Sequence, residues 1–128
     1  MKQENPWIEI CPGIRRRTHA HGRTMYQMVA ELARGSRMPE HQHSQEQIVH
    51  ILSGRMRLIV EGTPQELATG DVFYLASNIP HGVETIEDTT RARYLQPASR
   101  RISGDRRKGT EFEEKLNSLN LRTTFLTC

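Results

Sequence analysis

The chain has 128 residues, of which 35% are hydrophobic and 26% charged, and its formal net charge is +3. This length and composition suffice for one hydrophobic core, so we expect a single globular domain and not a wholly disordered protein. No apolar run approaches the ~18 residues of a transmembrane helix, and the polar start is unlike a signal peptide, so we expect a cytoplasmic protein without a membrane partner. Basic residues gather at 15–17 and 100–108, but no nucleic-acid-binding motif accompanies them, so we expect no nucleic acid partner.

The middle of the chain consists of short segments in which apolar and polar residues alternate. This period of two is typical of a strand with one buried face. In chain order, we predict strands over residues 25–32, 47–52, 55–61, 65–68, 72–75, 82–86 and 92–96. Turns rich in Gly, Pro, Asn or Asp separate most of these segments. Short strands of this kind indicate an all-β fold, an antiparallel sandwich or barrel.

The pattern changes after residue 104. Apolar residues there recur at helical spacing at 112, 116 and 119, and Thr110 with Glu113 can form a capping box. We therefore predict a barrel domain over residues 1–103, followed by a tail over residues 104–128 that contains one short helix.

Three of the six histidines are arranged as metal ligands would be. His41 and His43 are two residues apart, so on an extended segment their side chains point to the same face. Gln47 has the same parity, whereas Glu46 falls on the opposite face, which favours Gln47 as a further ligand. His81 follows about forty residues later, and an antiparallel fold can return it beside the first two. We predict that these four residues, His41, His43, Gln47 and His81, bind one divalent metal ion.

The spacing of these residues resembles the two motifs of the cupin superfamily. The first, G-x5-H-x-H-x3,4-E-x6-G, is matched over residues 35–54, with Gln47 in place of the acidic ligand. The second, G-x5-P-x-G-x2-H-x3-N, is matched at Gly70 and His81. Three other positions of the second motif differ, namely Ala76, Asn78 and Thr85.

The resemblance implies a double-stranded β-helix, or jelly-roll barrel, with the metal ion inside its wider mouth. Three neutral imidazoles suit Ni, Zn, Fe or Mn. Because a glutamine is a neutral ligand, the site would keep a charge of about +2 and would favour an anionic substrate. The resemblance also implies a homodimer, since small cupins commonly pair through their sheets. Ile48 and Leu52, which have outward parity, are available for such a contact.

Residues 41–55 and 70–83 resemble more closely the pectin-degradation branch of the cupins, which converts unsaturated uronates into linear ketosugars. That branch also places a glutamine at the fourth ligand position. Its last strand carries a segment resembling D-x-F-x-P-x-R that is implicated in catalysis. Aligned on Pro97, this chain has Arg93 in place of the acid. An inward Arg93 would hold a carboxylate of the substrate, but parity alone leaves its direction open.

These features lead to the hypothesis of a metal-dependent isomerase or lyase that acts on a small anionic, sugar-acid-like substrate. The candidate catalytic residues are Arg93, Tyr26 and Tyr74. Two other functions stay open at this point. An iron-dependent dioxygenase would use the same histidines and consume oxygen, whereas a non-catalytic binding or sensor module would have a pocket without a catalytic acid or base.

Overall fold

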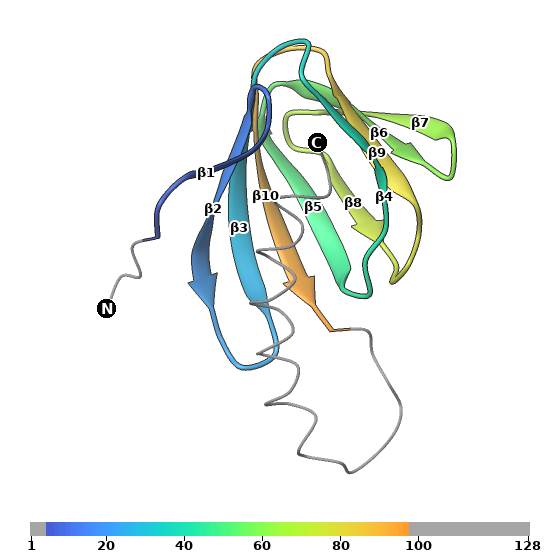
Figure 1. Cartoon of the computed structure of the whole chain (residues 1–128). Coiled ribbons are helices and arrows are strands. Elements are labelled where there is room, and N and C mark those ends of the chain that lie inside the picture. Colours follow the sequence, from blue (N-terminus) through green and yellow to red (C-terminus); the bar gives the residue numbers. More distant parts are fainter. Residues whose placement is uncertain (1–4, 98–128) are drawn as a thin grey trace.

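A computed structural model describes residues 5–97, and the regular secondary structure of these residues is entirely β-strand (Figure 1). The strands are β1 (Ile8–Cys11), β2 (Ile14–His21), β3 (Tyr26–Leu32), β4 (Arg37–His41), β5 (Glu46–Ser53), β6 (Arg55–Val60), β7 (Thr63–Ala68), β8 (Val72–Leu75), β9 (His81–Thr85) and β10 (Thr89–Gln96). The predicted helix at 110–119 and the predicted boundary after residue 103 lie outside this range. No helix of the described part is long and apolar enough to span a membrane.

Two antiparallel sheets face each other and enclose the core (Figure 1). The larger sheet has six strands in the order β1-β2-β3-β10-β5-β8, and the smaller has four in the order β4-β9-β6-β7. Both sheets contribute to one buried apolar cluster, which includes Ile14 and Ile51 from the larger sheet and Leu58 and Val83 from the smaller. The all-β barrel expected from the sequence is therefore confirmed.

The alternation of β5 is the pattern that the sequence predicted. Gln47 and Val49 point inward and are at most 2% exposed. Ile48 and Leu52 lie on the outer face and are 42% and 44% exposed. A one-residue shift would reverse these faces, so this strand fixes which side chains of the larger sheet reach the interior.

Three strands, β1, β2 and β4, were not predicted from the sequence. In β2 the run Arg15-Arg16-Arg17 hides the alternation, because Arg16 points inward and is buried. In β4 the pattern is interrupted by Pro39, which disfavours a strand interior. The predicted strand ends were otherwise displaced by up to three residues, as at β10, which begins at Thr89 instead of residue 92.

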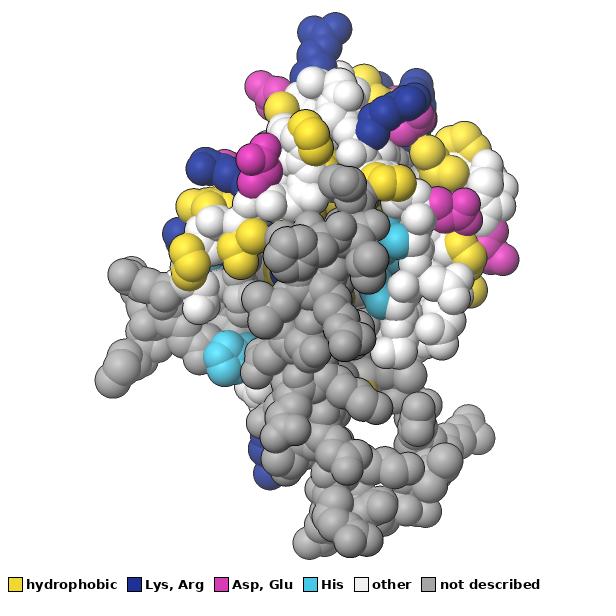
Figure 2. Space-filling model, viewed as in Figure 1, with side chains coloured by type: hydrophobic (Ala, Val, Ile, Leu, Met, Phe, Trp, Pro, Cys, Tyr) yellow, Lys and Arg dark blue, Asp and Glu magenta, His cyan; other side chains and the backbone are white. Residues whose placement is uncertain are grey.

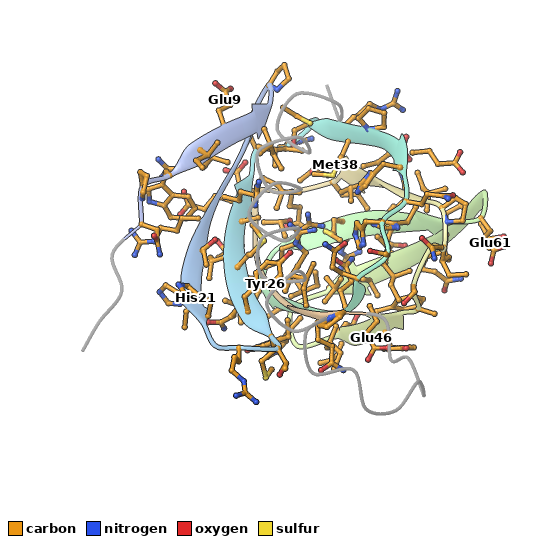
Figure 3. All side chains as sticks on the ribbon, turned by 60° about the horizontal axis from the view of Figure 1, so that its bottom comes forward. Glu9, His21, Tyr26, Met38, Glu46 and Glu61 are labelled. Carbon is orange, nitrogen blue, oxygen red and sulfur yellow. The ribbon has the colours of Figure 1, made fainter. Side chains whose placement is uncertain are left out.

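The register places the inward residues of the larger sheet in successive layers. Gln47 and Tyr26 both lie opposite Leu95 of β10. One layer further in, Met28 lies opposite Arg93. Figure 3 views the barrel from the lower end in Figure 1, and the buried Tyr26 and Met38 lie within it while Glu9 and Glu61 lie on its outside. Polar side chains therefore occur in both layers, Gln47 and Tyr26 in the first and Arg93 in the second.

Candidate functional site

Three histidine side chains converge between the sheets. His41 ends β4, His43 follows it by two residues, and His81 begins β9. His41 and His81 lie directly opposite each other in the β4–β9 pair. The potential ligand nitrogen atoms of the three residues all lie within 4.8 Å of one another. The antiparallel pairing thus brings together residues that are about forty positions apart in the sequence.

Each imidazole ring is held by a backbone carbonyl group close to it in the chain. The Nδ1 atoms of His41, His43 and His81 lie 2.9, 3.0 and 2.8 Å from the carbonyl oxygens of residues 39, 45 and 79. Because a carbonyl only accepts hydrogen bonds, each Nδ1 carries the proton and donates it. The Nε2 atom of each ring is therefore the one left with a free lone pair.

Two of these Nε2 atoms are buried without a hydrogen-bond partner. They belong to His43 and His81, and within residues 5–97 they are among the few buried side-chain polar atoms left unpaired. An unpaired buried nitrogen with a lone pair is costly unless a proton donor or a metal ion satisfies it. Neutral imidazoles whose other nitrogen is fixed by a backbone carbonyl are the usual protein ligands of transition metals. The residues present therefore fit such an ion.

Burial keeps the three rings in the neutral form. It lowers the pKa of His43 to about 4 and that of His81 to about 3, and it also lowers the pKa of His41. The positive charge of Arg93 lowers the pKa of all three residues further. Metal ions bind the neutral imidazole, so at neutral pH no proton has to leave before an ion binds.

Gln47 faces the interior from β5, on the sheet opposite to the histidine strands. It is 2% exposed, and its Oε1 atom accepts a hydrogen bond of 3.4 Å from Nη1 of Arg93. An amide oxygen has two lone pairs, so one stays available for a further partner. Gln45, which the sequence analysis did not consider, is also buried and lines the same cavity as His41 and His43.

Two of the three candidate catalytic residues lie at this site. Arg93 and Tyr26 point inward, are 8% and 6% exposed, and line one cavity with His41 and His43. The direction of Arg93, which parity left open, is therefore inward. Tyr74 lies on the outer surface instead, 56% exposed, and its hydroxyl donates a hydrogen bond to Glu46.

Comparison with known protein families identifies the family of this chain. A family described as "Cupin domain" matches residues 28–96, which is more than half of the chain. The chain belongs to the cupin family.

This cupin is similar to proteins of pectin degradation. It is 29% identical over 86 residues to the pectin degradation protein KdgF of Dickeya dadantii, a match that covers 66% of this chain and 78% of that protein. Its fold resembles the structure of KdgF from Halomonas sp., with a TM-score of 0.68, 27% identity, and 73% of this chain and 87% of that chain covered. Salicylate 1,2-dioxygenase from Pseudoaminobacter salicylatoxidans shares the fold alone, with a TM-score of 0.66, 15% identity, and 69% of this chain and 26% of that chain covered.

Two inward arginines of this cupin were missed by the sequence analysis. Arg16 is 3% exposed and Arg91 is 2% exposed. Arg91 has the same parity as Arg93, and Arg16 has the same parity as the buried Ile14. The alternation along β10 and β2 therefore indicates that both arginines point inward. This indication was overlooked because arginine is almost never fully buried unless it is paired.

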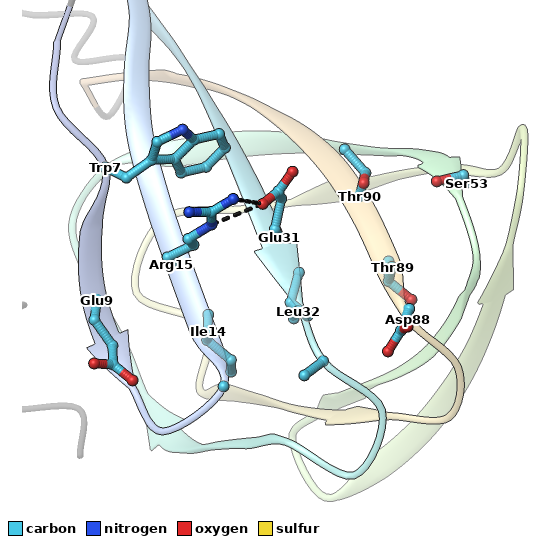
Figure 4. A pocket seen from close by; sticks show the side chains of 12 residues that line it. Trp7, Glu9, Ile14, Arg15, Glu31, Leu32, Ser53, Asp88, Thr89 and Thr90 are labelled. Carbon is cyan, nitrogen blue, oxygen red and sulfur yellow. Dashed lines mark hydrogen bonds and ion pairs between the residues drawn. The ribbon is translucent and has the colours of Figure 1, made fainter.

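A surface hollow of this cupin lies away from the histidines. It has a volume of about 670 Å³ and is bounded by Trp7, Arg15, Glu31 and Thr90 on the outer side of the larger sheet (Figure 4). Arg15 and Glu31 form an ion pair with each other inside it. The cavity beside the histidines is much smaller, about 30 Å³, room for about one water molecule.

Proposed function

We propose that His41, His43, Gln47 and His81 hold one divalent transition metal ion, Ni, Zn, Fe or Mn. The observation that carries this proposal is the pair of buried Nε2 atoms on His43 and His81 that have no hydrogen-bond partner in the described part of the chain. Their Nδ1 atoms are already committed to backbone carbonyls. Gln47 is included as the fourth ligand because it faces the interior and one lone pair of its Oε1 atom is not used by the hydrogen bond from Arg93.

The protein is then a metal-dependent isomerase or lyase that acts on a small anionic, sugar-acid-like molecule such as an unsaturated uronate. The similarity to two pectin degradation proteins supports this substrate class. The charge of the site supports it too, because the only buried residues among 5–97 that are charged at neutral pH are arginines. An anionic molecule would be attracted to this interior.

The chain's own residues can orient the substrate and move a proton. When bound, the metal ion would supply a Lewis acid that polarises an oxygen of the substrate. Arg93 can bind a carboxylate of the substrate through its guanidinium group. Tyr26 lines the same cavity. Burial raises the pKa of Tyr26, against the lowering effect of Arg93 and Arg16, so its hydroxyl keeps its proton at neutral pH and can donate it.

An assay with metal-loaded protein tests this function. Unsaturated uronates are offered to protein loaded with each of the four ions, and loss of the substrate double bond is followed by ultraviolet absorbance and NMR. We expect turnover with at least one ion, and a roughly 100-fold loss in Tyr26→Phe. Tyr74→Phe, an exposed tyrosine, is the matched control and should retain full activity.

The other outcomes of this assay separate the alternatives. Oxygen consumption restricted to the ferrous protein would support the dioxygenase. The absence of any turnover by protein that holds its metal ion would favour a binding or sensor module. Equal activity of Tyr26→Phe and the unchanged protein would contradict the role of Tyr26 while leaving the metal site intact.

The chain is further proposed to form a homodimer through the outer face of its larger sheet. Three exposed apolar side chains lie there on neighbouring strands, Ile48, Val72 and Tyr74. Ile48 lies directly opposite Tyr74 in the β5–β8 pair. Apolar side chains that adjoin across strands form a continuous patch, which is typical of a protein contact surface.

A further inference from the structure

The loop between β8 and β9 contacts two of the candidate metal ligands through backbone groups. The backbone N–H group of Asn78 donates a hydrogen bond of 2.8 Å to the carbonyl oxygen of His43. The next residue, Ile79, supplies the carbonyl oxygen that lies 2.8 Å from Nδ1 of His81. Two adjacent residues of one loop therefore connect His43 with His81.

His43 depends on this loop more than the other two histidines do. His41 and His81 belong to β4 and β9 and face each other across that strand pair, whereas His43 lies between β4 and β5, outside any strand. Its ring is held by the carbonyl group of Gln45, which belongs to the same irregular segment. The hydrogen bond from Asn78 ties this segment to the loop that leads into β9.

Asn78 has an uncommon backbone conformation. Its φ is +61°, and within residues 5–97 the only other non-glycine residue with positive φ is Glu61. Most side chains with a Cβ atom disfavour this left-handed region, but asparagine tolerates it. Position 78 is also one at which the second cupin motif has a glycine. The chain therefore has at this position a residue type that can adopt the conformation that glycine adopts most readily.

The φ angle of Asn78 sets the position of His81 relative to His43. Rotation about the N–Cα bond of Asn78 swings all the following loop residues relative to the N–H group that His43 holds. A residue restricted to negative φ would displace the carbonyl group of Ile79 or break the hydrogen bond to His43. The ligand nitrogens lie within 4.8 Å of one another. Two nitrogens at ~2.1 Å from one ion are at most ~4.2 Å apart, so the site tolerates little further separation.

The histidines are held in place without ion pairs. Within residues 5–97, no ion pair involves His41, His43 or His81. The cyan histidine side chains on the right of Figure 2 adjoin white atoms, which belong to the backbone and to uncharged polar side chains. The side chain of Asn78 is itself exposed. The contribution of Asn78 therefore comes from its backbone.

We propose that Asn78 is a positioning residue of the metal site, whose left-handed backbone holds His43 and His81 within reach of one ion. The inference rests on the proposed function, because it concerns the ligands of the same ion. A residue that disfavours positive φ at position 78 will weaken metal binding, and a glycine there will preserve it.

Metal titration of variants of the full chain tests this role. Calorimetry measures the affinity of metal-free protein for Zn²⁺ and Co²⁺, and the visible spectrum of bound Co²⁺ reports its ligands. Asn78→Val should weaken binding roughly 10- to 100-fold, because a β-branched residue strongly disfavours positive φ. Asn78→Gly should bind the ions as tightly as the unchanged protein does.

Gly70→Val is the matched control that separates positioning from stability. Gly70 has φ +90° and precedes β8, whereas Asn78 follows that strand. Both variants place a β-branched side chain at positive φ, so both should unfold at a lower urea concentration. Only Asn78→Val should lose affinity and change the Co²⁺ spectrum. If Asn78→Val does not fold, Asn78→Ala has a smaller penalty and should show a weaker loss of affinity in the same direction.

NMR of the imidazole nitrogens in metal-free protein distinguishes failure of this inference from failure of the proposed function. The ring signals of His43 should shift in Asn78→Val and stay in place in Gly70→Val. Protein that binds no metal but shows this shift refutes only the metal-dependent function. Unshifted His43 signals with equal metal affinity in Asn78→Val and Gly70→Val would overturn the positioning role. A loss of affinity in Asn78→Gly as large as that in Asn78→Val would overturn it too.

Discussion

At the scale of single residues, the histidine cluster is prepared by the backbone before any ion binds. Each Nδ1 atom donates to a carbonyl two positions away in the chain, at residues 39, 45 and 79. These hydrogen bonds select the tautomer and orient the rings without a carboxylate partner. The rings must be neutral to act as ligands. Their protonation state can therefore be tested by changing the pH.

Metal-free protein should lose stability as the pH falls from about 6.5 towards 3. An unfolded histidine has its ordinary pKa of ~6.5, whereas the pKa of folded His81 is about 3. Between these values the unfolded state binds protons that the folded state does not, so the free energy of unfolding falls with pH. Urea unfolding of metal-free protein across this range measures the effect.

His81→Gln is the comparison for that experiment. Glutamine does not titrate, so the variant should show a shallower fall in unfolding free energy over the same pH range. Identical slopes for the variant and the unchanged protein would contradict the assignment of His81 as a buried neutral imidazole.

Which side chains point into the barrel could be predicted from the sequence where a spacing rule applied. The parity of β5 placed Gln47 inside, as the structure has it. Arg16 and Arg91 share the parity of inward neighbours but were overlooked, because hydropathy scores every arginine as a surface residue. Tyr74 was a candidate that parity could not exclude, because the face of β8 that meets the core depends on its pairing with β5.

At the scale of elements, the two turns that flank β6 each use a glycine with positive φ. Gly54 has φ +101°, and an added Cβ atom there would lie 2.3 Å from the carbonyl oxygen of Asp88. Gly62 has φ +82°, and nothing would lie within 4 Å of its Cβ atom. The β5–β6 turn therefore needs glycine for space as well as for conformation, and it holds β5, the strand of Gln47, in register.

Gly54→Ala should destabilise the protein by about 3 kcal/mol or more, since it combines backbone strain with a close contact. Gly62→Ala should lose only about 1 kcal/mol from its positive φ. Urea unfolding of both variants measures the difference. Similar losses in the two variants would show that the backbone at Gly54 moves away without penalty.

Which elements could be predicted depended on the clarity of their alternation. Strands β3 and β6 have apolar residues at every second position, and β5 alternates in the same way with Gln47, Val49 and Ile51 inward. All three strands were predicted nearly to their ends. Strand β2 was missed because its inner face carries Arg16, and β4 because it is short and contains Pro39. Two of the three missed strands contribute to the site, because β2 carries Arg16, which lines the cavity beside the histidines, and β4 ends at His41.

At the scale of the whole molecule, the proposed homodimer depends on the apolar patch on the outer face of β5 and β8. Ile48→Asp should convert the dimer to a monomer, because it places a charge at the centre of that patch. Ile8→Asp is the control, since Ile8 is similarly exposed but lies on β1 at the opposite edge of the sheet. Sedimentation velocity measures the oligomeric state of the unchanged protein and of both variants. An unchanged protein that sediments as a monomer would refute the dimer.

The central claim for the molecule is that His41, His43, Gln47 and His81 hold one metal ion inside the barrel. The most direct test is elemental analysis of protein purified without added metal or a histidine tag, beside the double variant His41→Ala/His81→Ala. We expect about one equivalent of a transition metal per chain in the unchanged protein and none in the variant. An unchanged protein that binds no metal, even after exposure to Ni²⁺, Zn²⁺, Fe²⁺ and Mn²⁺ in turn, would contradict the claim.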